Sequence, residues 1–268
     1  MIETICNSFP RGPFRAAIFD FDGTLSLLRR NWQDVMIPMM VEILSAVDAA
    51  ASREDLFSHV EEFVMRLNGR QTIYQMIQLA DEVKQRGGQP LDPLEYKNQY
   101  HDLLWQQVSA RIDAAGNDRA AREQMMVPMA EAMLSSLQKQ GLTLFLASGT
   151  DLKYVQNELE VLGLQDYFGP RVYGALDDYK NFSKAMIIEK IIHDCKLQGN
   201  QLIGFGDGFV EIEEIKKVRG LAVGVASNEK SREGINDWKR QRLIRAGADL
   251  IIGDYTCRQP LLEMIGSK

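Results

Sequence analysis

Five short apolar segments constrain the fold of this chain more than any other feature. They occupy residues 15–21, 142–148, 201–207, 221–227 and 249–254. Each is almost continuously hydrophobic rather than alternating with polar residues, which is typical of parallel strands covered on both faces of a sheet. Helical patterns separate the later segments, at residues 151–162, 184–195, 210–219 and 231–246. This alternation predicts an α/β fold: a doubly wound, mainly parallel, Rossmann-like sheet.

The interval between the first two apolar segments has a different pattern. Residues 28–127 place apolar side chains at three- and four-residue spacing and contain no convincing strand. Turn-forming segments interrupt this helical pattern at GGQP (87–90) and AGND (115–118). Because the interval is too long for a simple crossover, we expect an inserted all-helical cap domain over 28–127. The core then consists of residues 1–27 and 128–268.

Charge and cysteine content narrow the partners and the compartment. The formal net charge is -6, with 31 Lys+Arg against 37 Asp+Glu and no long basic stripe, which argues against a nucleic-acid partner. The sequence contains no window of 18 uninterrupted apolar residues, so we expect no membrane span. The three cysteines are far apart and form no CxxC pair, so we expect a cytoplasmic protein in a reducing compartment. Nothing in the sequence indicates an oligomeric state.

Two carboxylates close the first apolar segment, in FDFDGT. Ligands of open α/β sheets bind beyond the carboxyl ends of the strands, so residues at these ends are the candidates for function. Asp20 and Asp22 are two positions apart, and residues with this spacing on a strand point the same way. Gly23 and Thr24 follow directly. Glycine there would allow a tight turn that brings backbone N–H groups close to a ligand.

Two further strand ends carry polar side chains. The second expected strand ends in Ser148 and Gly149, and the third ends in Asp207 with Glu211 four residues later. Each of these has an ordinary alternative explanation when taken alone, as a turn, a helix cap or a solvated helix face. Their joint occurrence at the carboxyl ends of expected strands predicts a shared site.

A lysine at the start of a helix adds the only cation to this set. In YKNFSKAMIIEKII, Ser183 is a good N-cap, and Lys184 in the first turn faces the positive end of the helix dipole. A bound anion would remove this conflict, because helix N-terminal N–H groups and a lysine together bind phosphate. Lys180 is an alternative, but we favour Lys184 because its helix follows directly. Carboxylates, a hydroxyl and a lysine together suit Mg²⁺ and a phosphoryl group.

The order of the segments FDFDGTL, LASGT, SKAMIIEKI and GFGDGFVEIE resembles the four motifs of the haloacid dehalogenase (HAD)-like phosphohydrolase superfamily. The long helical interval resembles the C1-type cap of this superfamily, as in relatives of phosphoglycolate phosphatase and β-phosphoglucomutase. The similarity covers about residues 15–254. The first motif is specific, whereas the other three are weak singly but occur in the right order on the right elements.

The resemblance implies a role for each motif residue. Asp20 would be the nucleophile that forms an aspartyl-phosphate, and Asp22 would donate a proton to the leaving oxygen and later accept one from water. Asp20, the backbone carbonyl of Asp22, and Asp207 would bind Mg²⁺. Glu211 stands where the family usually carries an aspartate, so it could bind a metal-coordinating water or shift the metal slightly.

The resemblance also implies phosphate and substrate contacts. Ser148 would donate a hydrogen bond to a phosphoryl oxygen, and Lys184 would neutralise both the phosphoryl group and Asp20. The remaining predicted substrate-binding residues are Gly23, Thr24, Gly149 and Arg70. Arg70 is predicted from its place in the NGR turn at 68–70 of the cap and not from the resemblance; a loop arginine is more often solvated. Arg29 and Arg30 are weaker candidates for binding an anionic substrate, and the SLLRR segment that contains them departs from the acidic residue that many relatives carry there.

These expectations converge on a Mg²⁺-dependent phosphatase that acts on a small phosphorylated metabolite. A sugar phosphomutase of the same fold is the nearest alternative, because it uses the same aspartyl-phosphate. A non-catalytic module that binds a phosphorylated ligand is the alternative from a different class. Dehalogenation is disfavoured, since a halide leaving group would not need the acid/base that Asp22 supplies.

Overall fold

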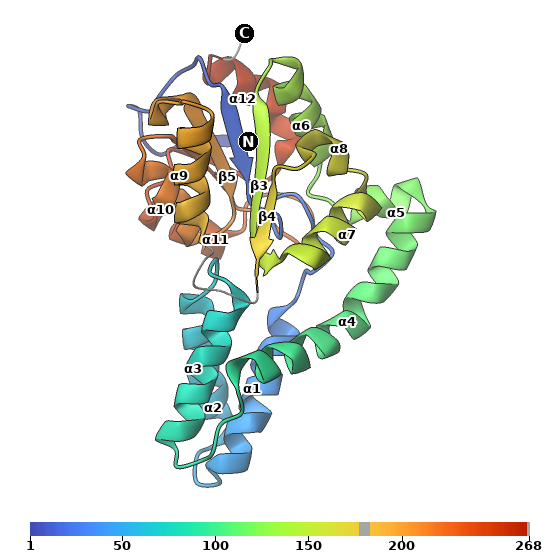
Figure 1. Ribbon diagram of the computed structural model, residues 1–268, viewed down its shortest axis with the longest axis vertical. Helices are drawn as coiled ribbons and strands as arrows, with labels where there is room; N and C mark the ends of the chain where they lie inside the picture. Colours follow the sequence, from blue (N-terminus) through green and yellow to red (C-terminus); the bar gives the residue numbers. More distant parts are fainter. Residues whose placement is uncertain (177–182, 267–268) are drawn as a thin grey trace. The chain divides into compact units, whose positions relative to one another are not determined.

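A computed structural model describes residues 1–176 and 183–266. Within one part of the chain, a seven-stranded sheet lies between layers of helices (Figure 1). The strand order is β1-β7-β6-β5-β2-β3-β4. All neighbouring pairs are parallel except β1 and β7. The strands are β1 (Ile2–Thr4), β2 (Ala16–Phe19), β3 (Thr143–Asp151), β4 (Val172–Ala175), β5 (Leu202–Gly206), β6 (Leu221–Val225) and β7 (Leu250–Ile252). The predicted doubly wound, mainly parallel α/β fold is confirmed.

Helices cover both faces of this sheet. One face packs against α6 (Ala130–Lys139), α7 (Leu152–Leu162), α8 (Gln165–Phe168) and α12 (Arg258–Met264). The other face packs against α9 (Lys184–Asp194), α10 (Phe209–Lys217) and α11 (Asp237–Arg245). Two 3₁₀ turns, η2 (Gly199–Gln201) and η3 (Tyr255–Cys257), complete the described connections. The result is a three-layer α/β/α arrangement.

The central strand β2 explains why the apolar segments are uninterrupted. Ala17 and Phe19 are buried in the layer that contains α7, and Ala16 and Ile18 are buried in the layer that contains α9. Since successive side chains of a strand point to opposite faces, a strand buried on both sides needs apolar residues at every position. All four residues of β2 are buried.

The helical interval contains α1 (Gln33–Val47), α2 (Arg53–Arg66), α3 (Thr72–Gln85), α4 (Pro93–Asn117) and α5 (Arg119–Gln124). The chain divides into two compact units, one of Met1–Arg30 with Ile112–Lys268 and one of Asn31–Arg111. The last residues of α4 and all of α5 lie in the first of these units. The extent of the cap domain, 28–127, stays a prediction. Among the helices of the described residues, none is long and apolar enough to cross a membrane.

Some element boundaries differ from the prediction. The short edge strands β1 and β4 were not predicted, because neither forms a long apolar run. The AGND segment was predicted as a break, but α4 continues through Asn117 and the chain turns at Asp118, which caps α5. The helix predicted over 231–246 begins later, at Asp237 behind the N-cap Asn236.

Candidate active site

The candidate site lies at the carboxyl end of β2, where the strand order reverses. β2 pairs with β3 on one side and β5 on the other, and Phe19 is in register with both Leu146 and Phe205. The backbone N–H of Asp20 continues this pairing, since it donates to the Phe205 carbonyl at 2.9 Å. The residues that follow these three strands therefore meet at one edge of the sheet, which is where open α/β sheets bind ligands.

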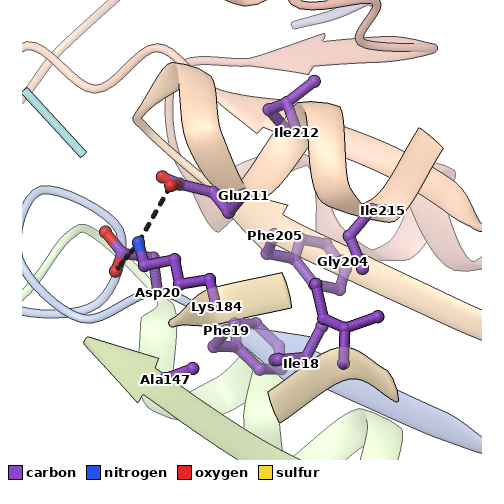
Figure 2. Close-up of a pocket in the computed structure, with 11 residues that line it drawn as sticks. Ile18, Phe19, Asp20, Ala147, Lys184, Gly204, Phe205, Glu211, Ile212 and Ile215 are labelled. Atoms are coloured by element: carbon purple, nitrogen blue, oxygen red, sulfur yellow. Dashed lines mark hydrogen bonds and ion pairs between the residues drawn. The ribbon is translucent and has the colours of Figure 1, made fainter. Parts of the chain in front are cut away.

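Lys184 joins two of the predicted carboxylates (Figure 2). Its Nζ lies 2.7 Å from Asp20 Oδ1 and 2.9 Å from Glu211 Oε2. Ser183 caps α9 by accepting the Met186 N–H at 3.2 Å, so Lys184 is the first helical residue, as predicted. Burial opposes the charge of Lys184, yet Asp20 and Glu211 raise the pKa of the ammonium above its ordinary value. Lys184 is therefore a buried, permanently charged cation at the carboxyl end of β2.

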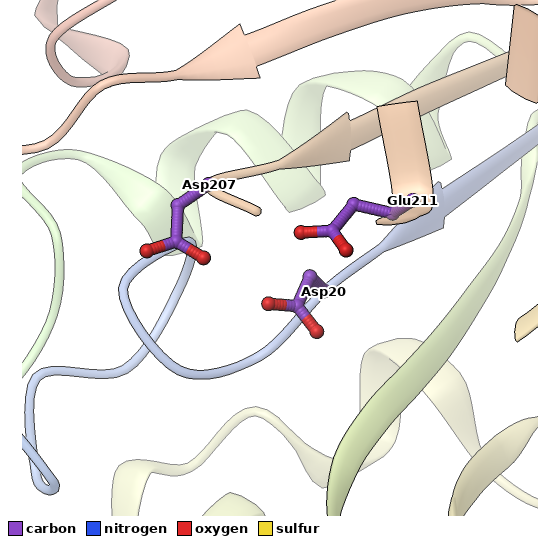
Figure 3. Close-up of side chains that lie close together, drawn as sticks. All are labelled: Asp20, Asp207 and Glu211. Carbon is purple, nitrogen blue, oxygen red and sulfur yellow. The ribbon is translucent and has the colours of Figure 1, made fainter. Parts of the chain in front are cut away.

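Three carboxylates lie close enough to share a metal ion (Figure 3). One oxygen from each of Asp20, Asp207 and Glu211 lies within 4.8 Å of the other two. Burial raises the pKa of Asp20 well above its ordinary value; Lys184 lowers it, and the charges of Glu211 and Asp207 raise it. Burial also raises the pKa of Asp207. Like charges held this close and out of water need a counter-cation, and hard oxygen ligands suit Mg²⁺. The residues present fit the predicted ion.

Glu211 also serves as a helix cap. Its Oε1 accepts the N–H of Gly208, the N-cap residue of α10, at 2.6 Å. A Cβ at Gly206 would lie 2.1 Å from Glu211 Cγ, so the side chain crosses directly over this glycine. The extra methylene of glutamate lets one carboxylate cap α10 and contact Lys184 at the same time. Its predicted metal contact would use the remaining lone pairs of these two oxygens.

Asp22 lies in a different environment from Asp20. Thr150 Oγ1 donates to Asp22 Oδ2 at 2.8 Å, and Oδ1 is buried without a hydrogen-bond partner among the residues described. Burial raises the pKa of Asp22 to about 7, against the opposing effects of Arg29 and the Thr150 hydrogen bond, while Glu158 and Asp207 raise it. A carboxyl group with this pKa can carry a proton or release it near neutral pH, as a general acid/base requires.

The turn after Asp22 is closed and tightly packed. Gly23 has φ +75°, and a Cβ there would lie 2.2 Å from Asp207 Oδ2. Its N–H donates to the Ser26 carbonyl at 2.9 Å. The Thr24 hydroxyl is buried and has no hydrogen-bond partner within the described part of the chain. Glycine is thus required at position 23 both by the backbone and by the approach of Asp207.

The second motif lies on the bulged end of β3. Ser148 is buried, and its Oγ accepts the Thr150 N–H at 3.0 Å, so the hydroxyl hydrogen can still be donated to a ligand. Gly149 is half-buried beside it. The register of β3 against β4 shifts between Ala147 and Asp151, which bends this segment out of regular pairing.

The predicted arginines lie in different units of the chain. Arg70 is exposed in the helical unit, between α2 and α3, and its role in substrate binding stays a prediction. Arg29 is buried, with its Nη2 2.6 Å from Glu158 Oε1, so it is an ion-paired residue of the sheet-containing unit. Arg30 lies next to it at the end of that unit. Lys180, the alternative to Lys184, lies outside the described residues.

Sequence reasoning missed a second buried lysine beside the carboxylates. Lys239 Nζ lies 2.7 Å from Asp207 Oδ2 and 2.6 Å from Glu229 Oε1. Lys239 is the third residue of α11, so it is a cation in a first helical turn, the same signal that identified Lys184. The signal was hidden because the predicted helix began at 231, which placed Lys239 in mid-helix. Thr150 and the Arg29–Glu158 pair were also missed as neighbours of Asp22.

Solved structures with the same fold cover nearly the whole chain. A β-phosphoglucomutase from Clostridium difficile is 15% identical, with a TM-score of 0.62, and the match covers 94% of this chain and 97% of that chain. A HAD hydrolase of family IA, variant 3, from Entamoeba histolytica is 17% identical with a TM-score of 0.61, covering 94% and 98%. A predicted phosphoglycolate phosphatase from Haemophilus somnus is 18% identical with a TM-score of 0.59, covering 92% and 97%. At these identities the likeness establishes the fold.

Sequence comparison identifies the family. No curated protein sequence matches the chain significantly. The sequence profile of haloacid dehalogenase-like hydrolases, in contrast, matches residues 14–219, which span all four motif segments and the helical interval. The chain therefore belongs to the haloacid dehalogenase-like hydrolase family.

Proposed function

We propose that the protein is a Mg²⁺-dependent phosphatase that hydrolyses a small phosphorylated metabolite through an aspartyl-phosphate. The observation that carries this proposal is the division of environments between Asp20 and Asp22. Asp20 is ion-paired with a buried lysine inside a carboxylate cluster, whereas Asp22 has a pKa of about 7 and lies outside that ion pair. One carboxylate is thus suited to attack and the other to transfer a proton.

The proposed reaction has two steps. In the first, an oxygen of Asp20 bonds to phosphorus, the bond from phosphorus to the leaving oxygen breaks, and protonated Asp22 gives its proton to that oxygen. In the second, Asp22 takes a proton from a water molecule as the water attacks the phosphorus of the aspartyl-phosphate. Asp20 then leaves as a carboxylate and inorganic phosphate is released. Each step uses the protonation state of Asp22 that the other produces.

The other groups stabilise charge during both steps. Lys184 contacts Asp20 at 2.7 Å and would neutralise the nucleophile and the phosphoryl oxygens beside it. Ser148 would donate its hydroxyl hydrogen to a phosphoryl oxygen. Asp20, Asp207, Glu211 and the backbone carbonyl of Asp22 would hold Mg²⁺. When bound, the ion would offset the repulsion between the Asp20 carboxylate and the phosphoryl group.

Phosphate release from a generic aryl phosphate, with and without Mg²⁺, tests the proposal, followed by a panel of phosphorylated metabolites. We expect release of phosphate that depends on the metal. A phosphomutase would instead convert a sugar phosphate into its isomer with little free phosphate, and a binding module would release none from any ester. Metal-independent or absent turnover across the panel would contradict the proposal. We place the reaction in the cytoplasm, in keeping with three free cysteines.

A further inference from the structure

The ammonium of Lys239, which has no role in the proposed reaction, is held by three acceptors. Besides Asp207 and Glu229, its Nζ donates to Ser227 Oγ at 3.1 Å. Lysine has three N–H donors, so each donor has one acceptor. The residue is only 7% exposed. A lysine buried this deeply and held on three sides has a defined position rather than a mobile surface one.

This contact network connects two separate motifs. Ser227 accepts from Lys239 and donates its own hydroxyl hydrogen to the Gly23 carbonyl at 2.5 Å. A Cβ at Gly23 would lie 2.9 Å from Lys239 Nζ, so the ammonium packs directly against the turn that follows Asp22. Lys239 therefore links the Asp207 carboxylate to the FDFDGT turn through one serine.

The two buried lysines divide the carboxylates between them. Lys184 pairs with Asp20 and Glu211, and Lys239 pairs with Asp207 and Glu229. Four carboxylates and two ammonium groups leave a formal charge of minus two. A single divalent cation would balance this charge. The two ion pairs are made through one oxygen of each carboxylate, Oδ1 of Asp20 and Oδ2 of Asp207.

We propose that Lys239 is a positioning residue for the divalent cation. It holds Asp207 Oδ2 in place, so that the other oxygen of Asp207 faces the ion. The proposal rests on the metal site of the proposed function. Groups that hold a metal ligand in place from behind typically contribute 10- to 100-fold to metal affinity. Without Lys239, the Asp207 carboxylate would lose its fixed orientation and its connection to the Gly23 turn.

Binding of Mn²⁺ alone, measured by isothermal titration calorimetry and by the electron paramagnetic resonance of free Mn²⁺, tests this proposal without substrate. We expect Lys239→Met to raise the Kd for Mn²⁺ by about 10- to 100-fold over the unsubstituted protein. Lys216→Met is the matched control. Lys216 Nζ also lies 2.7 Å from a buried aspartate, Asp249, but this pair is outside the carboxylate cluster. The Lys216→Met variant should have a lower melting temperature than the unsubstituted protein and the same Kd for Mn²⁺.

The possible outcomes separate this inference from the proposed function. If the unsubstituted protein binds no Mn²⁺, the metal site of the proposed function fails, and this inference fails with it. If the unsubstituted protein binds Mn²⁺ and Lys239→Met binds it within twofold as tightly, only the role of Lys239 is overturned. If Lys239→Met does not fold, Lys239→Arg decides. Its planar guanidinium keeps the charge but not the contact geometry, so a Kd at least about threefold higher supports the proposal and an unchanged Kd overturns it.

Discussion

The two carboxylates of FDFDGT differ in their surroundings although they are two positions apart. Asp20 contacts a buried ammonium, whereas Asp22 accepts a hydrogen bond from a threonine hydroxyl. We expect Asp20→Asn to lower kcat by a factor of about 10⁴ or more, because an amide cannot act as the nucleophile. Lys184 keeps Glu211 as a partner, so the fold should survive. Phosphate release and a melting curve measure both effects.

Asp22→Asn is the comparison for this variant. Asp22→Asn leaves Asp20 in place, so mass spectrometry should detect phosphorylated protein even though turnover is low. Asp20→Asn should form no aspartyl-phosphate at position 20. Near-normal turnover of Asp20→Asn would remove Asp20 as the nucleophile.

The pH dependence of turnover depends on Asp22. The first step needs its protonated form, and its pKa is raised to about 7, so kcat/KM should fall as pH rises above about 7. The Thr150 hydrogen bond stabilises the carboxylate form and lowers this pKa. Thr150→Val should therefore raise the pKa and move the alkaline limb up by about half a unit to one unit, the equivalent of one hydrogen bond. A pH–rate profile measures the shift.

Thr150→Ser is the matched control, because it keeps the hydroxyl donor and should keep the limb in place. If the alkaline limb of the pH–rate profile is unchanged in Thr150→Val, or moves to lower pH, Asp22 is not the group whose titration produces it.

At the scale of elements, sequence reasoning succeeded where a pattern was long or a cap was strong. The five buried strands were predicted because burial on both faces requires uninterrupted apolar residues. α7 ends at Leu162, where the predicted helix over 151–162 ends, and Gly163 with φ +70° is its C-cap. β1 and β4 were missed because strands of three and four residues at sheet edges need few apolar residues. The start of α11 was missed because Asn236 is a cap inside a segment with helical composition.

Strand ends and helix starts supply the part of the site that could be predicted from the sequence. Asp20, Asp207, Glu211 and Lys184 meet as expected, because strand ends and helix starts of a parallel sheet gather at one edge. Lys239 and Glu229 come from the loop and helix after β6, where no motif marks them. Their side chains reach Asp207 only through tertiary packing. Which groups hold a predicted ligand in place therefore depends on contacts that a single sequence does not display.

Glu211 gives a prediction at the scale of a helix end. Its carboxylate caps α10 through the Gly208 N–H and contacts Lys184 through the other oxygen. Glu211→Gln keeps a side-chain oxygen that can accept the Gly208 N–H, whereas Glu211→Ala leaves this N–H without its acceptor. We expect Glu211→Ala to have a free energy of unfolding about 1–2 kcal/mol below that of Glu211→Gln in metal-free protein. Urea denaturation measures the difference, and equal stability of the two variants would contradict the capping role.

For the whole molecule, metal binding and pH should act on stability together. Burial raises the pKa values of Asp20 and Asp207 above those of the unfolded chain. The folded state then holds protons more tightly than the unfolded state, so in metal-free protein this contribution to stability falls as pH rises from about 4 through the raised pKa values. Mg²⁺ needs the ionised carboxylates. We therefore expect Mg²⁺ to raise the melting temperature more at pH 8 than at pH 5.5.

The size of this effect follows from mass action. At a Mg²⁺ concentration about 100 times its Kd, binding adds about 2.7 kcal/mol, or roughly 5–10 °C in a chain of this size. Differential scanning fluorimetry with Mg²⁺ or with EDTA at the two pH values measures it. Asp207→Asn is the control that should lose the Mg²⁺ effect at both. An equal rise at both pH values in the unsubstituted protein would contradict the linkage.

The central position of β2 has a consequence for the order in which the protein forms during synthesis. β2 is complete at Phe19, but its neighbours begin only at Thr143 and Leu202. The unit Asn31–Arg111 is built from helices with local contacts, so it can fold while still attached to the ribosome. β2 must wait unpaired until more than half of the chain has been synthesised. Nascent chains halted before β5 should therefore contain a folded helical unit and no catalytic centre.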